Sequence, residues 1–299
     1  MQSRRQLIKA AVAIAAASVL PAGLTAQAAS APLAWKHFPA GEQGFFRAPI
    51  LIAGQREALL IDAGFTLSDG EALAQAIQAS GKTLTTIYIS HSDPDYYFSL
   101  APIKAAFPEA RVVAASATIH AIKANVEKKL ATWGPQLKTN GPQTLADIVM
   151  PQAFDGKQLT LEGHAIEIID AKASANRRYL WVPSLHAVFG GVQVFSGTHV
   201  WTADTPSAAA RKAWIEDLDA MLTRKPAVVI AGHLAPGGST DASAIRYTRD
   251  YLIAFEQELA QAADSAALVA AMTKRYPNAA MPVALQIGAK VAKGEMKWG

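Results

Sequence analysis

The chain has 299 residues, of which 51% are apolar and 17% are charged, and it contains no cysteine. This composition is typical of a globular protein of one or two domains, and it excludes disulfides, thiolate nucleophiles and cysteine-based metal centres. The formal net charge is +4, but residues 1–30 contain three basic residues and no acidic one, and removing them leaves +1. We therefore expect no nucleic-acid partner.

The first segment of the chain has the features of an export signal. Arg4 and Arg5 precede an apolar stretch over residues 10–20, which is too short to cross a bilayer. Residues 26–28 provide the small residues that a signal peptidase accepts. We predict a signal peptide over residues 1–28, a periplasmic location and no membrane association after cleavage. The paired arginines favour the twin-arginine route, and an ordinary secretory signal is the alternative.

The first predicted elements of the mature chain are a hairpin and a helix. Apolar runs at residues 50–52 and 59–61 flank a turn, which predicts two antiparallel strands. Ser68 and Glu71 form a capping-box pattern, which predicts the start of a helix that ends at Gly81.

A buried strand and a long amphipathic helix are expected next. The β-branched and aromatic residues 86–90 predict the strand, which runs directly into a polar segment that begins at His91. Apolar residues at helical spacing then predict one face of a helix: Ile119, Ile122, Val126, Leu130 and Trp133.

The second half of the chain contains further strand patterns, followed by helices. The strand patterns lie at residues 159–161, 166–169, 179–182 and 187–189. Thr205 and Pro206 predict the start of a helix, residues 227–231 a buried strand, and Asp241 the cap of another helix. Since no repeat or linker divides the chain, we expect one α/β domain over residues 29–299 with helices at its C-terminal end.

Side chains suited to metal binding follow two of the predicted strands. His91, Asp93 and Asp95 occupy alternate positions directly after the first buried strand, and His233 follows a later strand through a glycine. Imidazole and carboxylate groups are ligands for zinc, iron and manganese. In a loop that leaves a strand, this spacing can bring several ligands to one point. The sequence thus predicts a candidate metal site at the strand ends.

Three motifs resemble the metallo-β-lactamase superfamily. They are Leu-Ile-Asp-Ala-Gly at residues 60–64, His-x-Asp-x-Asp-Tyr at residues 91–96 and Ala-Gly-His at residues 231–233. The resemblance implies a four-layer αββα sandwich, in which two mixed β-sheets lie face to face between helices and the site lies at one edge. It also implies that Asp62 is a carboxylate that braces the site without binding metal.

The motifs depart from the superfamily's pattern at several ligand positions. The pattern reads His-x-His-x-Asp-His, whereas Asp93 replaces its second histidine and Tyr96 its last one. Residues 171–176 lack a further expected histidine, and Gly191 stands where a metal-bridging aspartate would follow Gly190. These departures argue against a site for two metal ions.

The resemblance implies a reduced site with at most one zinc or other divalent ion. Its core ligands would be His91, Asp95 and His233, with Asp93 or His199 as the fourth ligand. Structural roles are the alternatives: His91 and His233 as hydrogen-bonded histidines near a strand end, Asp93 as a turn residue, and His199 as a surface or network histidine.

Two classes of function remain open. The first is an exported hydrolase in which a metal-activated water attacks an ester, lactone, amide or phosphoester of a small molecule. There Asp95 would orient the water or accept its proton, and Tyr96 would stabilise the oxyanion. The second is a metal-free, catalytically degenerate relative that binds a small molecule or a protein partner in the old active-site cleft. The missing ligands favour the second class, and the retained ligands favour the first.

Overall fold

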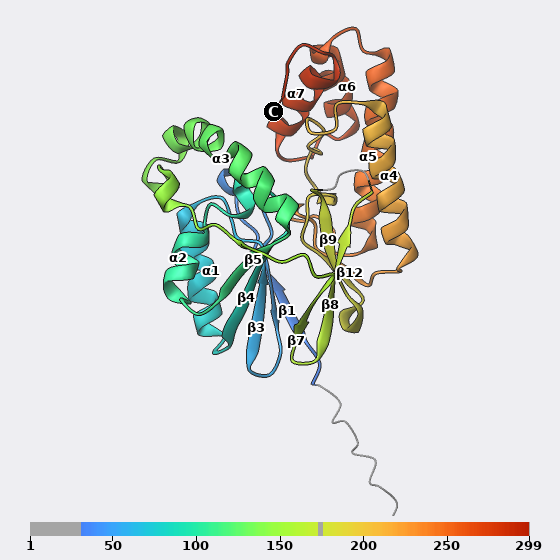
Figure 1. Ribbon diagram of the computed structural model, residues 1–299. Coiled ribbons are helices and arrows are strands. Elements are labelled where there is room, and N and C mark those ends of the chain that lie inside the picture. Colours follow the sequence, from blue (N-terminus) through green and yellow to red (C-terminus); the bar gives the residue numbers. More distant parts are fainter. Residues whose placement is uncertain (1–30, 173–175, 299) are drawn as a thin grey trace, which may run out of the picture.

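The computed structural model describes residues 31–172 and 176–298, so the predicted signal peptide at residues 1–28 lies outside the described residues. Two β-sheets face each other, and helices lie on their outer sides (Figure 1). The predicted αββα sandwich is therefore confirmed. Within the described ranges, no helix combines the length and the apolar character needed to span a membrane.

The first sheet has six strands in chain order. They are β1 (Ala34–His37), β2 (Ile50–Ala53), β3 (Glu57–Ile61), β4 (Thr83–Ile89), β5 (Arg111–Ala114) and β6 (Gln152–Ala153). The antiparallel pair of β2 and β3 is the predicted hairpin. Strands β3 to β6 are parallel, so the carboxyl ends of β3 and β4 lie side by side at one edge.

The second sheet is mostly antiparallel. Its order is β12 (Val228–Val229), β10 (Ala187–Phe189), β9 (Arg178–Val182), β8 (His164–Asp170) and β7 (Gln158–Leu161). A separate parallel pair is formed by β11 (Phe195–Ser196) and β13 (His233–Leu234). The expected strand over residues 227–231 is thus shorter than predicted, and His233 lies within a strand. The reason is a change of partner, because the Ile230 N–H binds the Val188 carbonyl whereas the Gly232 N–H binds the Val194 carbonyl.

Three helices follow strands of the first sheet: α1 (Leu67–Ala79), α2 (Leu100–Ala106) and α3 (Ser116–Leu137). The predicted capping box of α1 is displaced, because Thr66 and Asp69 form it in place of Ser68 and Glu71. The Thr66 Oγ1 accepts the Asp69 N–H at 3.1 Å, whereas Ser68 already lies inside the first turn. Gly81 follows the end of α1 as expected, and α3 contains the predicted apolar face.

Four helices belong to the second half of the chain: α4 (Ala208–Thr223), α5 (Ala242–Gln261), α6 (Ser265–Arg275) and α7 (Pro282–Ala292). Helix α5 packs against α4 and against β11 and β12, whereas α6 and α7 pack against each other beyond the end of the sheets (Figure 1). Asp241 caps α5 as predicted. Helix α4 begins later than predicted, because Ser207 is its cap and the Thr205 hydroxyl donates to the Thr202 carbonyl in the preceding turn. Trp298, which follows α7, lies against α3, because the Lys129 Nζ is 5.6 Å from the centre of the Trp298 ring.

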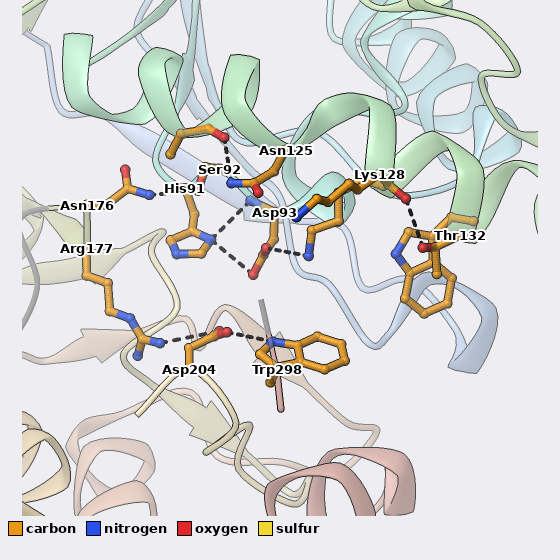
Figure 2. Close-up of a pocket in the computed structure, with 13 residues that line it drawn as sticks. His91, Ser92, Asp93, Asn125, Lys128, Thr132, Asn176, Arg177, Asp204 and Trp298 are labelled. Atoms are coloured by element: carbon orange, nitrogen blue, oxygen red, sulfur yellow. Dashed lines mark hydrogen bonds and ion pairs between the residues drawn. The ribbon is translucent and has the colours of Figure 1, made fainter. Parts of the chain in front are cut away.

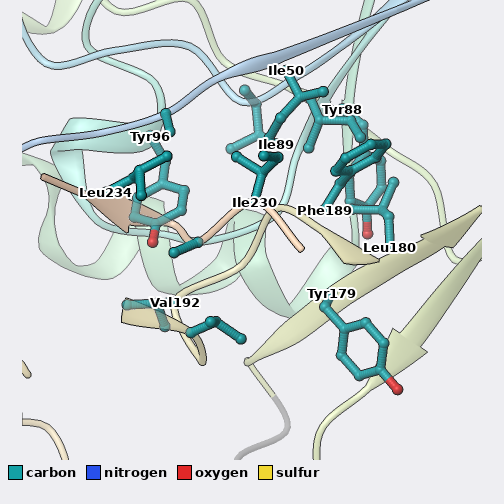
Figure 3. Close-up of a cluster of buried hydrophobic side chains, with 14 of the residues drawn as sticks. Ile50, Tyr88, Ile89, Tyr96, Tyr179, Leu180, Phe189, Val192, Ile230 and Leu234 are labelled. Carbon is teal, nitrogen blue, oxygen red and sulfur yellow. The ribbon is translucent and has the colours of Figure 1, made fainter. Parts of the chain in front are cut away.

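The core lies between the two sheets (Figure 3). Ile50 and Ile89 of the first sheet and Leu180 and Phe189 of the second are each at most 1% exposed. Burial of each such side chain contributes about 1.5–3 kcal/mol relative to exposure. This apolar layer fixes the strand ends, and the polar residues that follow them are consequently held at one edge.

Candidate functional site

Loops that follow three strands are joined by hydrogen bonds at this edge. Asp62 follows β3, Ser90 follows β4, and Gly191 follows β10. The Ser90 N–H and hydroxyl each donate to the Asp62 carboxylate at 2.7 Å, and the Gly191 N–H donates to the Ser90 hydroxyl at 2.8 Å. These bonds hold Asp62 in the left-handed backbone region, with φ of +60°.

Arg47 occupies the centre of the edge, although the sequence analysis did not single it out. The side chain is fully buried, and its Nη2 lies 3.2 Å from Asp62 Oδ2. Its Nε donates to the Asp95 backbone carbonyl at 3.3 Å and lies 3.5 Å from Asp95 Oδ2, and its Nη1 donates to the Gly232 carbonyl. The guanidinium carbon lies 3.5 Å from the centre of the Tyr96 ring. Every nitrogen of this cation therefore has a partner.

Asp95 and Tyr96, the predicted catalytic residues, both contact the Arg47 guanidinium. Burial raises the pKa of Asp95 to about 7, although Arg47 opposes the shift. Burial also raises the pKa of Tyr96 well above its ordinary value, so its hydroxyl stays protonated. That hydroxyl donates to the Gly191 carbonyl at 3.2 Å, and its proton is therefore already directed at the protein backbone.

His91 and His233 lie against the same tyrosine ring. The centre of the Tyr96 ring is 5.0 Å from that of His91 and 6.4 Å from that of His233. The His233 Nδ1 bonds to the Phe45 carbonyl at 2.7 Å, and its Nε2 lies 3.7 Å from Asp95 Oδ2. Burial lowers the pKa of His91 to about 4 and that of His233 to about 3, so both rings are neutral at pH 7.

Asp93 and His199 have other partners. The Asp93 N–H donates to the His91 Nδ1 at 3.2 Å, and the Asp93 Oδ1 lies 3.4 Å from the Lys129 Nζ. Burial opposes ionisation of Asp93, but His91 and Lys129 together hold its pKa below the ordinary value. The His199 Nδ1 lies 2.9 Å from the hydroxyl of Tyr251 in α5. The structure thus brings Asp93 next to His91 and directs His199 toward α5.

The donor set does not fit a divalent ion. Among residues 31–172 and 176–298, no three histidine, aspartate or glutamate side chains are arranged to hold a metal. A catalytic zinc needs three protein ligands, whereas the carboxylates of Asp62 and Asp95 are directed at Arg47. The guanidinium supplies the positive charge that these two buried carboxylates require.

Gly191 cannot be replaced by a residue with a side chain in this backbone. Its φ is +74°, and a Cβ there would lie 2.1 Å from the Arg178 carbonyl oxygen. The position at which the superfamily's pattern has a bridging aspartate therefore has no space for one.

Two cavities lie beside the edge. The larger has a volume of about 440 Å³ and lies between α3, His91, Arg177 and Trp298 (Figure 2). The smaller, of about 50 Å³, is the one that Asp95 and His233 line, together with aromatic side chains. Because a drug-sized ligand needs about 300–1,000 Å³, only the larger cavity can hold one.

Comparisons with known proteins agree with this fold. A family model described as the metallo-beta-lactamase superfamily matches residues 44–233. A metallo-beta-lactamase from Pontibacter korlensis is similar in structure, with a TM-score of 0.51, 16% identity, and coverage of 75% of this chain and 96% of that chain. The VMB-1 structure has a TM-score of 0.52 and 17% identity, and the match covers 75% of this chain and 94% of that chain. The DIM-1 metallo-beta-lactamase has a TM-score of 0.52 and 16% identity, with coverage of 74% of this chain and 93% of that chain. At this identity, the structures show a shared fold. Among curated protein sequences, none matches the chain.

Proposed function

This chain belongs to the metallo-β-lactamase superfamily, and we propose that it is a metal-free member that binds a small molecule in the cleft at the sheet edge. The observation that carries the proposal is the position of Arg47. Its guanidinium pairs with Asp62, the predicted bracing carboxylate, and with Asp95, a predicted metal ligand. A divalent ion and a buried guanidinium in one cluster would repel each other.

A small molecule suits the cleft better than a protein partner does. The larger cavity has a volume of about 440 Å³, which is within the range of small-molecule sites. Its wall mixes charged, amide and indole groups, which is the combination that orients a ligand. This supports the binding of a small molecule beside the Arg47 cluster.

The hydrolase with a metal-activated water is the competing proposal. It needs His91, Asp95 and His233 to share one ion, and Asp95 would have to exchange its contact with Arg47 for that ion. No step through a metal follows from the present arrangement. The two proposals predict different zinc contents for the purified protein, which can be measured.

The test is the zinc content of protein purified without chelator from cells supplied with zinc. We expect well under one zinc per chain by elemental analysis, and no saturable zinc binding by calorimetry. The variant His233→Ala should give the same values as the wild type. One zinc per chain that is lost in His233→Ala would contradict the proposal and support the hydrolase.

We also propose that the chain is exported to the periplasm by the twin-arginine route. The support is the Arg4-Arg5 pair before the apolar stretch and the small residues at 26–28. Replacing both residues (Arg4→Lys with Arg5→Lys) should leave unprocessed precursor in the cytoplasm. Normal processing of this variant would indicate the secretory route.

A further inference from the structure

The larger cavity is lined by a buried cation with unused hydrogen-bond donors. Arg177 is 5% exposed, and its Nη2 lies 3.5 Å from Asp204 Oδ2. No described residue accepts a hydrogen bond from its Nη1. A guanidinium has five N–H donors, and leaving buried donors unsatisfied is unfavourable. Because Arg177 also lines the cavity, an anionic ligand bound there would lie beside a guanidinium whose hydrogen bonding is incomplete.

The other charges around the cavity leave it with an excess of positive charge. Lys129 pairs with Asp93 at 3.4 Å, and Arg177 pairs with Asp204 at 3.5 Å. Lys128 also lines the cavity, and it has no carboxylate partner within the described part of the chain. The cavity thus has three cationic and two anionic side chains, which favours an anionic ligand.

Two indole rings provide apolar surface in the same cavity. Trp133 belongs to α3, whereas Trp298 lies near the end of the chain, on the side of Arg177 and Asp204 (Figure 2). Trp298 is fixed by its Nε1, which donates to Asp204 Oδ1 at 2.8 Å, and by the Trp201 ring at 5.2 Å. Indole faces bind flat apolar or aromatic groups.

We propose that this cavity binds a small organic anion, whose carboxylate or phosphate pairs with Arg177 and whose flat body contacts Trp133 and Trp298. The planar guanidinium fork matches both anionic groups. The inference rests on the proposed function, because protein side chains alone supply the positive charge. The inference goes beyond the proposed function because it names the class of ligand and the residue that selects this class.

The binding test uses three naphthalene probes and protein dialysed against chelator. The probes are 1-naphthoate, 1-naphthyl phosphate and the neutral 1-naphthylmethanol, measured by calorimetry and by tryptophan fluorescence. We expect at least one of the two anions to bind about tenfold or more tightly than the alcohol, because a charge-assisted hydrogen bond contributes that much. The ratio between the two anions identifies the preferred group.

Variants locate the binding to the cavity. Arg177→Gln should weaken the preferred anion about tenfold or more and leave the alcohol unchanged, and Arg177→Lys should restore part of the affinity. Lys128→Gln should weaken the anion about two- to fivefold because it removes a nearby charge. Lys123→Gln is the matched control, because Lys123 is exposed on α3 and does not line the cavity. If Arg177→Gln does not fold, the pair of lysine variants still decides the question.

Each of the following results would contradict the inference. Equal affinity for the anions and the alcohol would remove the role of charge. Equal effects of Lys128→Gln and Lys123→Gln, or no effect of Arg177→Gln, would place the binding elsewhere. No binding of any probe to zinc-free protein would overturn this inference but not the metal-free proposal. Anion binding that appears only after zinc is added would overturn both.

Discussion

Arg47 and Arg177 are both buried arginines near one sheet edge, but their surroundings differ. Arg47 has two carboxylates, two backbone carbonyls and an aromatic ring around it. Arg177 has one long ion pair with Asp204 and its guanidinium carbon lies 5.0 Å from the centre of the Trp214 ring, but its Nη1 has no hydrogen-bond partner among the described residues. Every guanidinium nitrogen of Arg47 has a partner within the protein, whereas the guanidinium of Arg177 has hydrogen-bond donors without one among the described residues. Burial alone therefore does not separate a structural arginine from a binding one, and the number of filled donors does.

The largest effect is expected for Arg47→Met, which removes the charge and keeps most of the side-chain volume. It leaves Asp62 and Asp95 buried without their cation, so we expect a loss of about 3–5 kcal/mol in the free energy of unfolding. Urea denaturation measures it. The control is Arg224→Met, whose pair with Glu167 is about one-third exposed, so the loss should stay below about 1 kcal/mol. Equal losses in the two variants would remove the distinction between the regions.

Ser90→Ala tests the hydrogen bonds that support the Arg47 cluster. The Ser90 hydroxyl donates to Asp62 and accepts the Gly191 N–H. Its removal leaves a buried N–H without a partner, so we expect a loss of about 1–3 kcal/mol in urea denaturation. Ser243→Ala changes an exposed serine in α5 and should cost about 0.5 kcal/mol or less. A stability loss for Ser90→Ala no larger than for Ser243→Ala would show that the strand ends are held by other contacts.

The smallest effect on stability is expected for Arg177→Gln. The Arg177 Nη1 has no hydrogen-bond partner among the described residues, and the contact with Asp204 is long, at 3.5 Å, so the free energy of unfolding should fall by about 1 kcal/mol. The same variant is expected to lose anion binding, which separates the two properties. A loss of unfolding free energy as large as that of Arg47→Met would instead identify Arg177 as a structural residue.

Local patterns were sufficient to predict much of the fold. The hairpin of β2 and β3, the apolar face of α3 and the Asp241 cap depend on residues within one or two turns of each other. The capping box of α1 was displaced because Thr66 and Ser68 are both suitable caps, and only the contacts of the folded chain decide between them. For the same reason, the strand at 227–231 was overextended, since its change of partner depends on distant residues.

The candidate site could be predicted only in part. The motifs identified His91, Asp95 and His233, and the structure brings all three to the ring of Tyr96 or to each other. Arg47 was missed because its partners are remote in sequence, and Gly232 is 185 residues away. A charged residue within the apolar segment before β2 was the one available signal. Arg177 and Trp298 meet at Asp204 through contacts that span 27 and 94 residues, which local patterns cannot predict either.

The tight contact at Gly191 also limits how this protein can be redesigned or can diverge. An aspartate at that position would collide with the backbone of Arg178, which cannot rotate away as a side chain can. A Cβ at the neighbouring Gly190 would lie 2.7 Å from Ile61, and one at Gly232 would lie 2.2 Å from the Gly191 carbonyl. A single codon change therefore cannot introduce a bridging carboxylate here. Such a residue would require the backbone of β9 to shift as well, so the substitution alone is not expected to create a second metal ligand here.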